Sequence, residues 1–129
     1  GAIDDQTYDK VVRETMERFA REGDAIIVGR GGQVILRDWP GTLHVHIYAP
    51  PEVRAQRLAE RYNITKLDAE RRIQRSDERK RAYIRNMHRN ANWKDLKYYH
   101  LAINTAAVPP EVAAQVIIQA ARGRDQQAA

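Results

Sequence analysis

The sequence of 129 residues contains no cysteine, which excludes a disulfide framework and a thiolate metal site. It also has no apolar run near the roughly 18 residues that a membrane span needs. The first nine residues are acidic and polar, unlike a secretion signal. No internal repeat is present. These absences favour a protein of the cytoplasm that makes no use of a membrane, and 43% hydrophobic residues suffice for the core of one domain.

Positive charge is concentrated in one part of the chain. Residues 54–94 hold 13 Lys and Arg against 5 Asp and Glu, a net charge of +8, while the other residues hold 9 against 12, a net charge of −3. A clustered basic field raises the local concentration of anions and favours a phosphate-bearing partner, either a nucleotide or a nucleic acid. The alternative interpretation is a solvated helical face.

Hydrophobic patterning predicts alternating helices and strands. Helices are expected at 7–21, 33–36, 51–62, 65–90 and from 110 onward, and strands at 25–28, 43–48 and 101–104. This order favours an α/β fold in which helices flank a parallel sheet in three layers. We expect a single domain over residues 1–129, with a tail at 123–129.

Two helix starts carry specific signals. Pro51 and Glu52 suit a first turn, where the missing proline N–H costs nothing and a carboxylate meets the positive end of the helix. Thr65 followed by Asp68 resembles a capping box in which Asp replaces Glu. The helix that begins there is rich in arginine.

Three stretches, residues 25–50, 75–85 and 92–105, closely resemble the cytidylate kinase-like family of P-loop nucleoside monophosphate kinases. The similarity runs from about residue 8 to residue 121, and three motifs in order are more specific than one glycine-rich loop. The resemblance implies a P-loop kinase-like sheet and, in the complete form, phosphoryl transfer from ATP with Mg²⁺ to a nucleoside monophosphate such as CMP. Nucleotides are then the expected partners.

The family's Walker A motif, G-x-x-x-x-G-K-[ST], is absent from these 129 residues. The turn at residues 29–32 is too short and has no following lysine and hydroxyl pair, so it is no substitute. We therefore expect a kinase-like domain that is not catalytically competent by itself. The alternatives are a non-catalytic nucleotide- or anion-binding regulatory module and a basic nucleic-acid-binding protein; charge alone supports the latter, because RNP-type and helix-turn-helix patterns are missing.

In the family, the first strand lies between the strands that match residues 25–28 and 43–48. Unpaired backbone groups left by its absence cost about 1 to 3 kcal/mol each when buried. Three solutions are expected. The chain is a fragment of a longer protein, which is our first choice, or the two strands close up directly, or two copies form a homodimer and complete each other's sheet.

The resemblance implies that Gly29, Arg30 and Asp77 bind the substrate. Arg30 matches the arginine that grips the phosphate of the acceptor nucleotide, a task suited to a guanidinium that donates two parallel hydrogen bonds. The structural alternative for Arg30 is a salt bridge at a turn, and the neighbouring glycines suit tight backbone geometry.

The arginine-rich segment, about residues 65–92, resembles the lid that closes over the donor's phosphates. Its candidate phosphate-binding residues are Arg75, Arg79, Arg81 and Arg85. Arg75 and Arg79 lie four residues apart, as do Arg81 and Arg85, so each pair shares one side of a helix. Like charges placed in this way repel unless an anion or a carboxylate lies between them. The family's cytidine-recognition pattern is not reproduced in this segment, so the acceptor base stays open.

Asn104 and Thr105 match the place where the family contacts the donor base; simple turn chemistry at a strand end is the alternative. His44 and His46 share one side of a strand, but no third metal ligand is evident and packing is the stronger interpretation. The sequence assigns no metal site and no catalytic residue.

Overall fold

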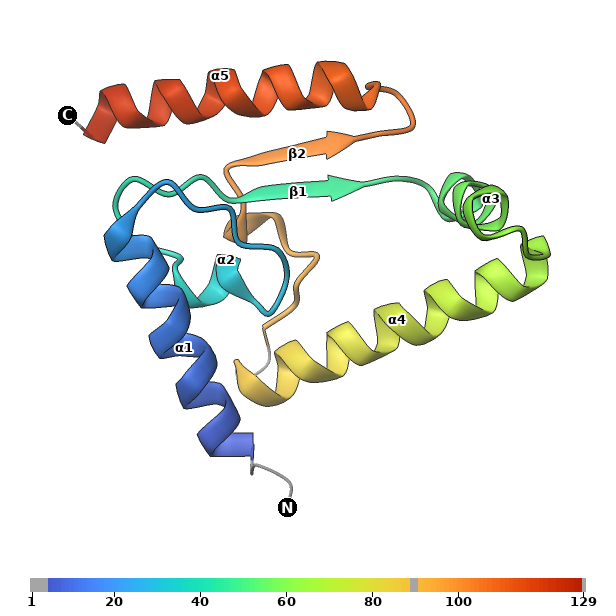
Figure 1. Ribbon diagram of the computed structural model, residues 1–129, viewed down its shortest axis with the longest axis horizontal. Helices are drawn as coiled ribbons and strands as arrows, with labels where there is room; N and C mark the ends of the chain where they lie inside the picture. Colours follow the sequence, from blue (N-terminus) through green and yellow to red (C-terminus); the bar gives the residue numbers. More distant parts are fainter. Residues whose placement is uncertain (1–4, 89–90, 129) are drawn as a thin grey trace.

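A computed structural model describes residues 5–88 and 91–128, in which five α-helices surround two short strands (Figure 1). In chain order the elements are α1 (Asp5–Glu22), α2 (Gly32–Ile35), β1 (Val45–Tyr48), α3 (Pro51–Tyr62), α4 (Lys66–Met87), the 3₁₀ helix η1 (Leu96–Tyr98), β2 (Leu101–Asn104) and α5 (Pro110–Ala128). The end of the predicted helix at 89–90 lies outside the described residues. The segment expected as a tail continues α5 to Ala128.

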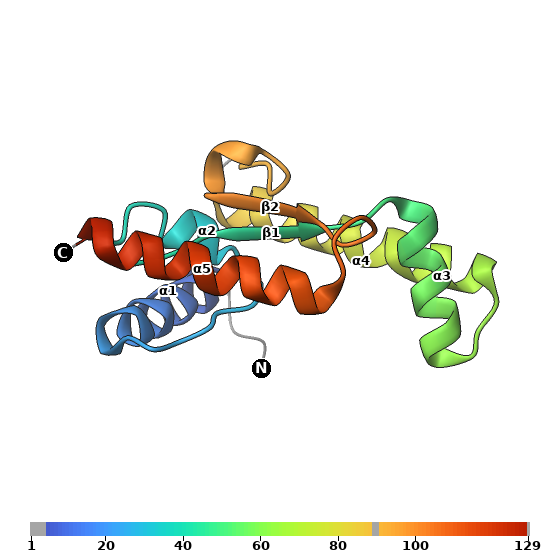
Figure 2. The same ribbon diagram turned by 90° about the horizontal axis from the view of Figure 1, so that it is seen from above.

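The sheet consists of β1 and β2, which pair in parallel from Val45 opposite Leu101 to Tyr48 opposite Asn104. α5 runs back alongside both strands in the two views (Figure 2). The α/β class is thus confirmed with a small parallel sheet, whereas the three-layer architecture expected from the sequence is not established by these two strands.

The strand predicted at residues 25–28 is wrong, because this segment is in neither a helix nor a strand. Ile26 is 94% exposed and Val28 is 87% exposed, and the two-stranded sheet leaves them unpaired. Direct closure onto β1, one of the three expected solutions, is therefore also wrong. An apolar run becomes a strand only when a neighbour accepts its hydrogen bonds, and within the described residues no neighbour lies there. The expected homodimer stays a prediction.

Helices α3 and α4 extend from the carboxyl end of β1 as an arm, and α4 then returns toward α1 (Figure 1). Pro51 opens α3 with Glu52 in its first turn. Thr65 caps α4, its Oγ1 accepting a hydrogen bond from the Asp68 N–H at 3.1 Å. These local signals agree with the sequence, and they fix the directions of the two helices that line the site described below.

The buried apolar side chains come from several different helices, from β2 and from loops. Among the described residues, the buried apolar side chains are Met16, Leu36, Ala55, Ala69, Ile84, Trp93, Tyr98, Ile103 and Ala113. Ala55 of α3 and Ala69 of α4 are almost fully buried, and such small side chains let two helices approach closely. None of the helices in the described part of the chain is both long and apolar enough to cross a bilayer.

Two stacked histidines, His44 and His100, make the start of the sheet sensitive to pH. Their rings are 5.2 Å apart, and His100 Nδ1 accepts a hydrogen bond from the His44 backbone N–H at 2.9 Å. Burial lowers the pKa of both imidazoles, and the positive charge of Arg124 on α5 lowers both further. The His44 ring also bonds the Leu36 carbonyl, which partly offsets the shift. The folded protein therefore holds both rings neutral.

Acidification should destabilise the fold for this reason. An imidazole whose folded pKa lies below its unfolded value stabilises the protein fully above that unfolded value, about 6.5, and loses this contribution as the pH falls toward the folded pKa. We expect a lower free energy of unfolding at about pH 5.5 than at about pH 7.5 in urea denaturation. His44→Gln keeps a donor for the Leu36 carbonyl and should flatten the dependence; equal pH dependence in both proteins would contradict this assignment.

Candidate functional site

A groove of about 650 Å³ opens between α3 and α4. Six of its ten lining residues are arginines, and the remaining four are uncharged. The arginines are Arg54, Arg57 and Arg61 of α3 with Arg72, Arg75 and Arg79 of α4. No carboxylate is among the groove's lining residues, so the arrangement concentrates cationic donors around one space.

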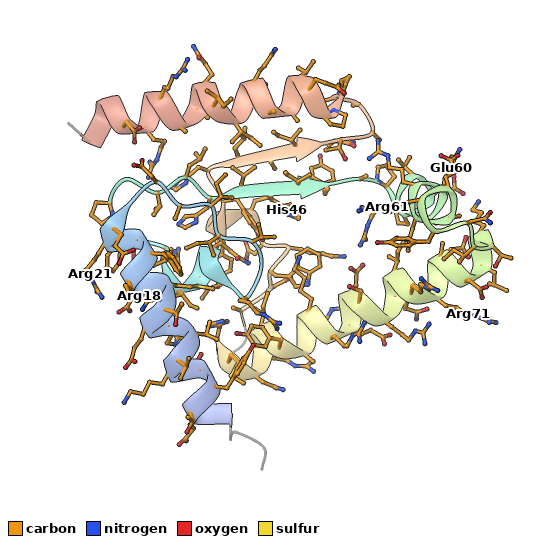
Figure 3. All side chains as sticks on the ribbon, in the orientation of Figure 1. Arg18, Arg21, His46, Glu60, Arg61 and Arg71 are labelled. Carbon is orange, nitrogen blue, oxygen red and sulfur yellow. The ribbon has the colours of Figure 1, made fainter. Side chains whose placement is uncertain are left out.

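Helical periodicity explains why these arginines face one another. On each helix they recur at intervals of three or four residues, which keeps them on one side. Other charged side chains of the same helices point elsewhere: Figure 3 shows Glu60 on the outer side of α3 and Arg71 on the outer side of α4. Charge is thus sorted between the groove and the outer surfaces rather than spread evenly around the two helices.

A bidentate salt bridge holds the two helices together at one end of the groove. Both terminal nitrogens of Arg54 donate to the two carboxylate oxygens of Asp77 at 2.9 Å. The hydrogen bonds from Arg54 lower the pKa of Asp77, and those to Asp77 raise the pKa of Arg54. Arg54 is therefore occupied, and within the described residues the other five arginines of the groove form no salt bridge with a carboxylate.

Arg57 joins the groove to the carboxyl ends of the strands. Its guanidinium donates to the Thr105 hydroxyl at 3.0 Å and to the Thr105 carbonyl at 2.8 Å. The Thr105 hydroxyl in turn donates to the Tyr48 carbonyl at 3.3 Å. Asn104, the other predicted base contact, accepts a hydrogen bond from the Ala106 N–H through its side chain. The turn chemistry considered for these two residues is therefore present.

The glycine turn between α1 and α2 packs against the carboxyl-terminal part of α4. Gly29, Arg30 and Gly31 all have positive φ, at 75°, 59° and 75°. The Arg30 guanidinium lies 5.7 Å from the centre of the Tyr83 ring, a cation–π contact rather than the salt bridge considered from the sequence. Arg30 is exposed and thus accessible to an anion.

The structure divides the predicted phosphate-binding arginines into two groups. Arg75 and Arg79 line the groove, whereas Arg81 and Arg85 are exposed on α4 and are not among its lining residues. Asp77 lies beside the groove with both oxygens bonded to Arg54. Gly29 and Arg30 lie at a different place, near the carboxyl-terminal part of α4. The predicted substrate and phosphate residues therefore include one group at the groove, made of Arg75, Arg79 and Asp77, and a second cluster, Gly29 and Arg30, in the loop that packs near the carboxyl-terminal part of α4.

Sequence reasoning missed four arginines of the groove. They are Arg54, Arg57, Arg61 and Arg72. The signal was present in the helix at 51–62, where the first three recur at helical spacing. The net charge of residues 54–94 does not show on which side of a helix the charges lie, so it did not reveal the row of arginines on α3 that faces α4.

The described residues do not provide a metal site. No group of three His, Asp or Glu side chains in the described ranges is arranged to hold an ion. Mg²⁺ in phosphate-transfer sites is usually held by one or two carboxylates together with the phosphates. The carboxylate nearest the groove, Asp77, has both oxygens bonded to Arg54. The donor set in this part of the chain therefore fits a bare anion better than Mg²⁺.

Comparison with solved structures finds a similar fold in an uncharacterised protein from Eubacterium ventriosum, with a TM-score of 0.76 and 22% sequence identity. The match covers 89% of this chain and 63% of that chain, so this chain spans less than two thirds of its relative's length. At this identity the match establishes the fold alone. A search of the curated proteins finds no match.

The sequence itself matches a family profile over most of its length. The profile of the cytidylate kinase-like family covers residues 1–107, from the start of the chain through β2 and the turn that contains Thr105. The matched range includes the glycine turn, the arginine groove and the ends of both strands. The chain belongs to the cytidylate kinase-like family.

Proposed function

We propose that this chain is a nucleoside monophosphate kinase-like domain, not catalytically competent by itself, that binds the phosphates of a nucleotide in the groove between α3 and α4. The observation that carries the proposal is the set of six arginines around one space of about 650 Å³, of which only Arg54 is bonded to a carboxylate in the described residues. Guanidinium groups bind phosphate through paired, charge-assisted hydrogen bonds. Membership of the family supports a nucleotide as the phosphate carrier.

Repulsion between the arginines supports the proposal that the groove binds an anion. Five arginines that form no salt bridge with a carboxylate in the described residues repel one another across a space whose lining carries no negative charge. A polyphosphate removes this repulsion and accepts several hydrogen bonds at once. The gain in free energy is therefore larger than for an anion that meets a single exposed side chain.

The second cluster suits the acceptor. Arg30 stands near the carboxyl-terminal part of α4, away from the groove, and its exposed guanidinium is available to the phosphate of a nucleoside monophosphate such as CMP. In this proposal Arg75 and Arg79 hold donor phosphates, and Arg30 holds the acceptor phosphate. Transfer between them needs a Walker A loop, which these 129 residues do not contain, so the activity proposed for this chain is binding.

The placement of the arginines on two facing helices favours a compact anion over a nucleic acid strand. The arginines of α3 and α4 face each other across the groove instead of forming one open stripe. An extended strand is usually bound along a continuous basic surface that follows its backbone. The nucleic-acid alternative therefore has less support from the geometry than from the charge count.

The proposal is tested by titrating the protein with ATP, inorganic tripolyphosphate and adenosine in a calorimeter. We expect ATP and tripolyphosphate to bind and adenosine to bind far more weakly, because the arginines recognise phosphate. Raising the salt from about 50 to 500 mM should weaken both polyphosphates through screening. Failure of tripolyphosphate to bind at low salt would contradict the proposal, as would tighter binding of an RNA or DNA oligonucleotide than of either polyphosphate.

A further inference from the structure

Aromatic side chains form a stack at the carboxyl end of β1, beside the arginine groove. The His46 ring stacks on Tyr48 and on Tyr99, with centroid distances of 5.5 and 4.8 Å and interplanar angles of 20° and 26°. Trp93 meets the same imidazole edge-on at 5.8 Å. The position of His46 below β1 is visible in Figure 3. The phosphate-binding role proposed above makes no use of these rings.

Tyr48 is the exposed end of this stack. Trp93 is 6% exposed and His46 and Tyr99 are half-buried, whereas Tyr48 is 45% exposed. His46 stacks on the Tyr48 ring, and almost half of Tyr48 stays exposed in spite of this contact. A flat aromatic surface is thus presented to solvent at the end of a parallel strand, where α/β proteins commonly bind ligands.

Further contacts hold the rings behind Tyr48 in place. The Tyr99 hydroxyl donates a hydrogen bond to the Trp93 carbonyl, and Lys80 of α4 lies 4.1 Å from the centre of the Trp93 ring. Burial, followed by the charges of Lys80 and Lys94, lowers the pKa of His46, so the imidazole is neutral near pH 7. The ring behind Tyr48 is therefore held in place and uncharged.

Two hydrogen bonds connect Tyr48 to the groove. The Tyr48 carbonyl accepts from the Thr105 hydroxyl at 3.3 Å, and the same hydroxyl accepts from Arg57, a lining residue of the groove, at 3.0 Å. These short links place the last residue of β1 next to the cationic lining. A nucleotide, which joins a flat ring to phosphates through a sugar, has the chemistry that matches the two neighbouring surfaces.

We propose that Tyr48, supported by His46 and Tyr99, is the stacking surface for the base of a nucleotide whose phosphates lie among the arginines of α3 and α4. This inference rests on the proposed function and adds the base to it. The residues expected to contact the base, Asn104 and Thr105, have side-chain oxygens bonded within the turn and to Arg57. Tyr48 lies directly opposite Asn104 in the sheet and offers an exposed aromatic ring.

Recognition by stacking predicts tolerance of different bases. Every base has a flat π-face, and stacking on an aromatic side chain is largely independent of sequence. In this arrangement the aromatic stack contacts the flat face of the base and does not need to recognise its hydrogen-bonding edge. We therefore expect ATP and CTP to depend on Tyr48 to a similar extent, with the arginines supplying the common phosphate contacts.

The test measures ATP, CTP and inorganic tripolyphosphate binding to the wild-type chain, Tyr48→Leu and Tyr48→Phe. Leucine keeps an apolar side chain but removes the aromatic face, so ATP and CTP should bind about tenfold more weakly, as expected for loss of one stacked base. Tripolyphosphate should bind equally to all three proteins. Phenylalanine retains the ring and should retain the nucleotide affinity.

Each result separates the two proposals. Unchanged ATP affinity in Tyr48→Leu would overturn the stacking role, and so would an equal loss for ATP and tripolyphosphate, which would show a structural effect on the groove. If tripolyphosphate does not bind the wild-type protein, the phosphate site fails. In that case ATP binding that still depends on the Tyr48 ring would preserve the base site, and absent ATP binding would overturn both.

Discussion

Replacing Arg75 and Arg79 together by glutamine is expected to lower the affinity for ATP by about 100-fold. Both side chains line the groove from α4. A hydrogen bond to a charged group contributes about 1.5 to 3 kcal/mol, and 1.4 kcal/mol corresponds to a tenfold change in the dissociation constant. Loss of two such contacts therefore gives roughly two orders of magnitude, measured by calorimetric titration of the variant with ATP.

A matched control removes the same charge elsewhere on the same helix. Arg81 and Arg85 also lie four residues apart, but neither is a lining residue of the groove, so Arg81→Gln/Arg85→Gln should bind ATP within about threefold of wild type at moderate salt. The groove variant should also unfold at the same or a higher temperature, because it loses mutual repulsion. Equal losses of affinity in both double variants would show that overall charge, and not the groove, binds ATP.

Among the glycines of the described residues, Gly31→Ala should be the most destabilising alanine substitution. The glycine has φ of +75°, and an added Cβ would lie 2.5 Å from His88 Nε2 and 2.9 Å from His88 Cδ2. The His88 ring is 8% exposed, and its Nδ1 lies 2.9 Å from Arg13 Nη2, so it cannot move aside freely. Left-handed strain of about 1 to 2 kcal/mol and overpacking of about 1 to 3 kcal/mol give a loss of roughly 2 to 5 kcal/mol in urea denaturation.

Gly29→Ala separates the two causes. Gly29 has the same φ of +75°, but an added Cβ would meet nothing within 4 Å, so only the conformational cost of about 1 to 2 kcal/mol is expected. Adding His88→Ala to the Gly31→Ala protein should give a smaller loss than the sum of the single variants, because the contact then no longer exists. Equal destabilisation by the two glycine substitutions, or strict additivity with His88→Ala, would refute the steric argument.

The helices of this chain were predictable because their signals are local. The proline and acidic residue at the start of α3 and the Thr65 cap of α4 act within one turn. The apolar run at residues 25–28 meets the sequence criteria for a strand at least as well as β1 does, yet only β1 has a partner strand. A strand depends on hydrogen bonds from another segment, so no pattern within four residues could distinguish the two.

The site was predictable in part for a related reason. Periodicity identifies pairs on one side of a helix, and it correctly grouped Arg75 with Arg79 on the groove side; it does not show which side of the helix faces α3, so Arg81 and Arg85 were grouped with them. The bond between Arg54 and Asp77 joins residues 23 positions apart. Only the packing of α3 against α4 reveals that one predicted substrate residue is bonded to an arginine of the groove.

The unpaired edge of β1 has a consequence for the behaviour of the protein in salt. Ile47 of β1 is exposed, and β1 has no sheet neighbour other than β2 among the described residues; an open strand edge of this kind promotes aggregation between copies. A net charge of +5 opposes this association by mutual repulsion. Added salt screens that repulsion and leaves the apolar attraction intact. We therefore expect high ionic strength to act twice, weakening the anion binding proposed for the arginines and favouring association of copies through the sheet edge.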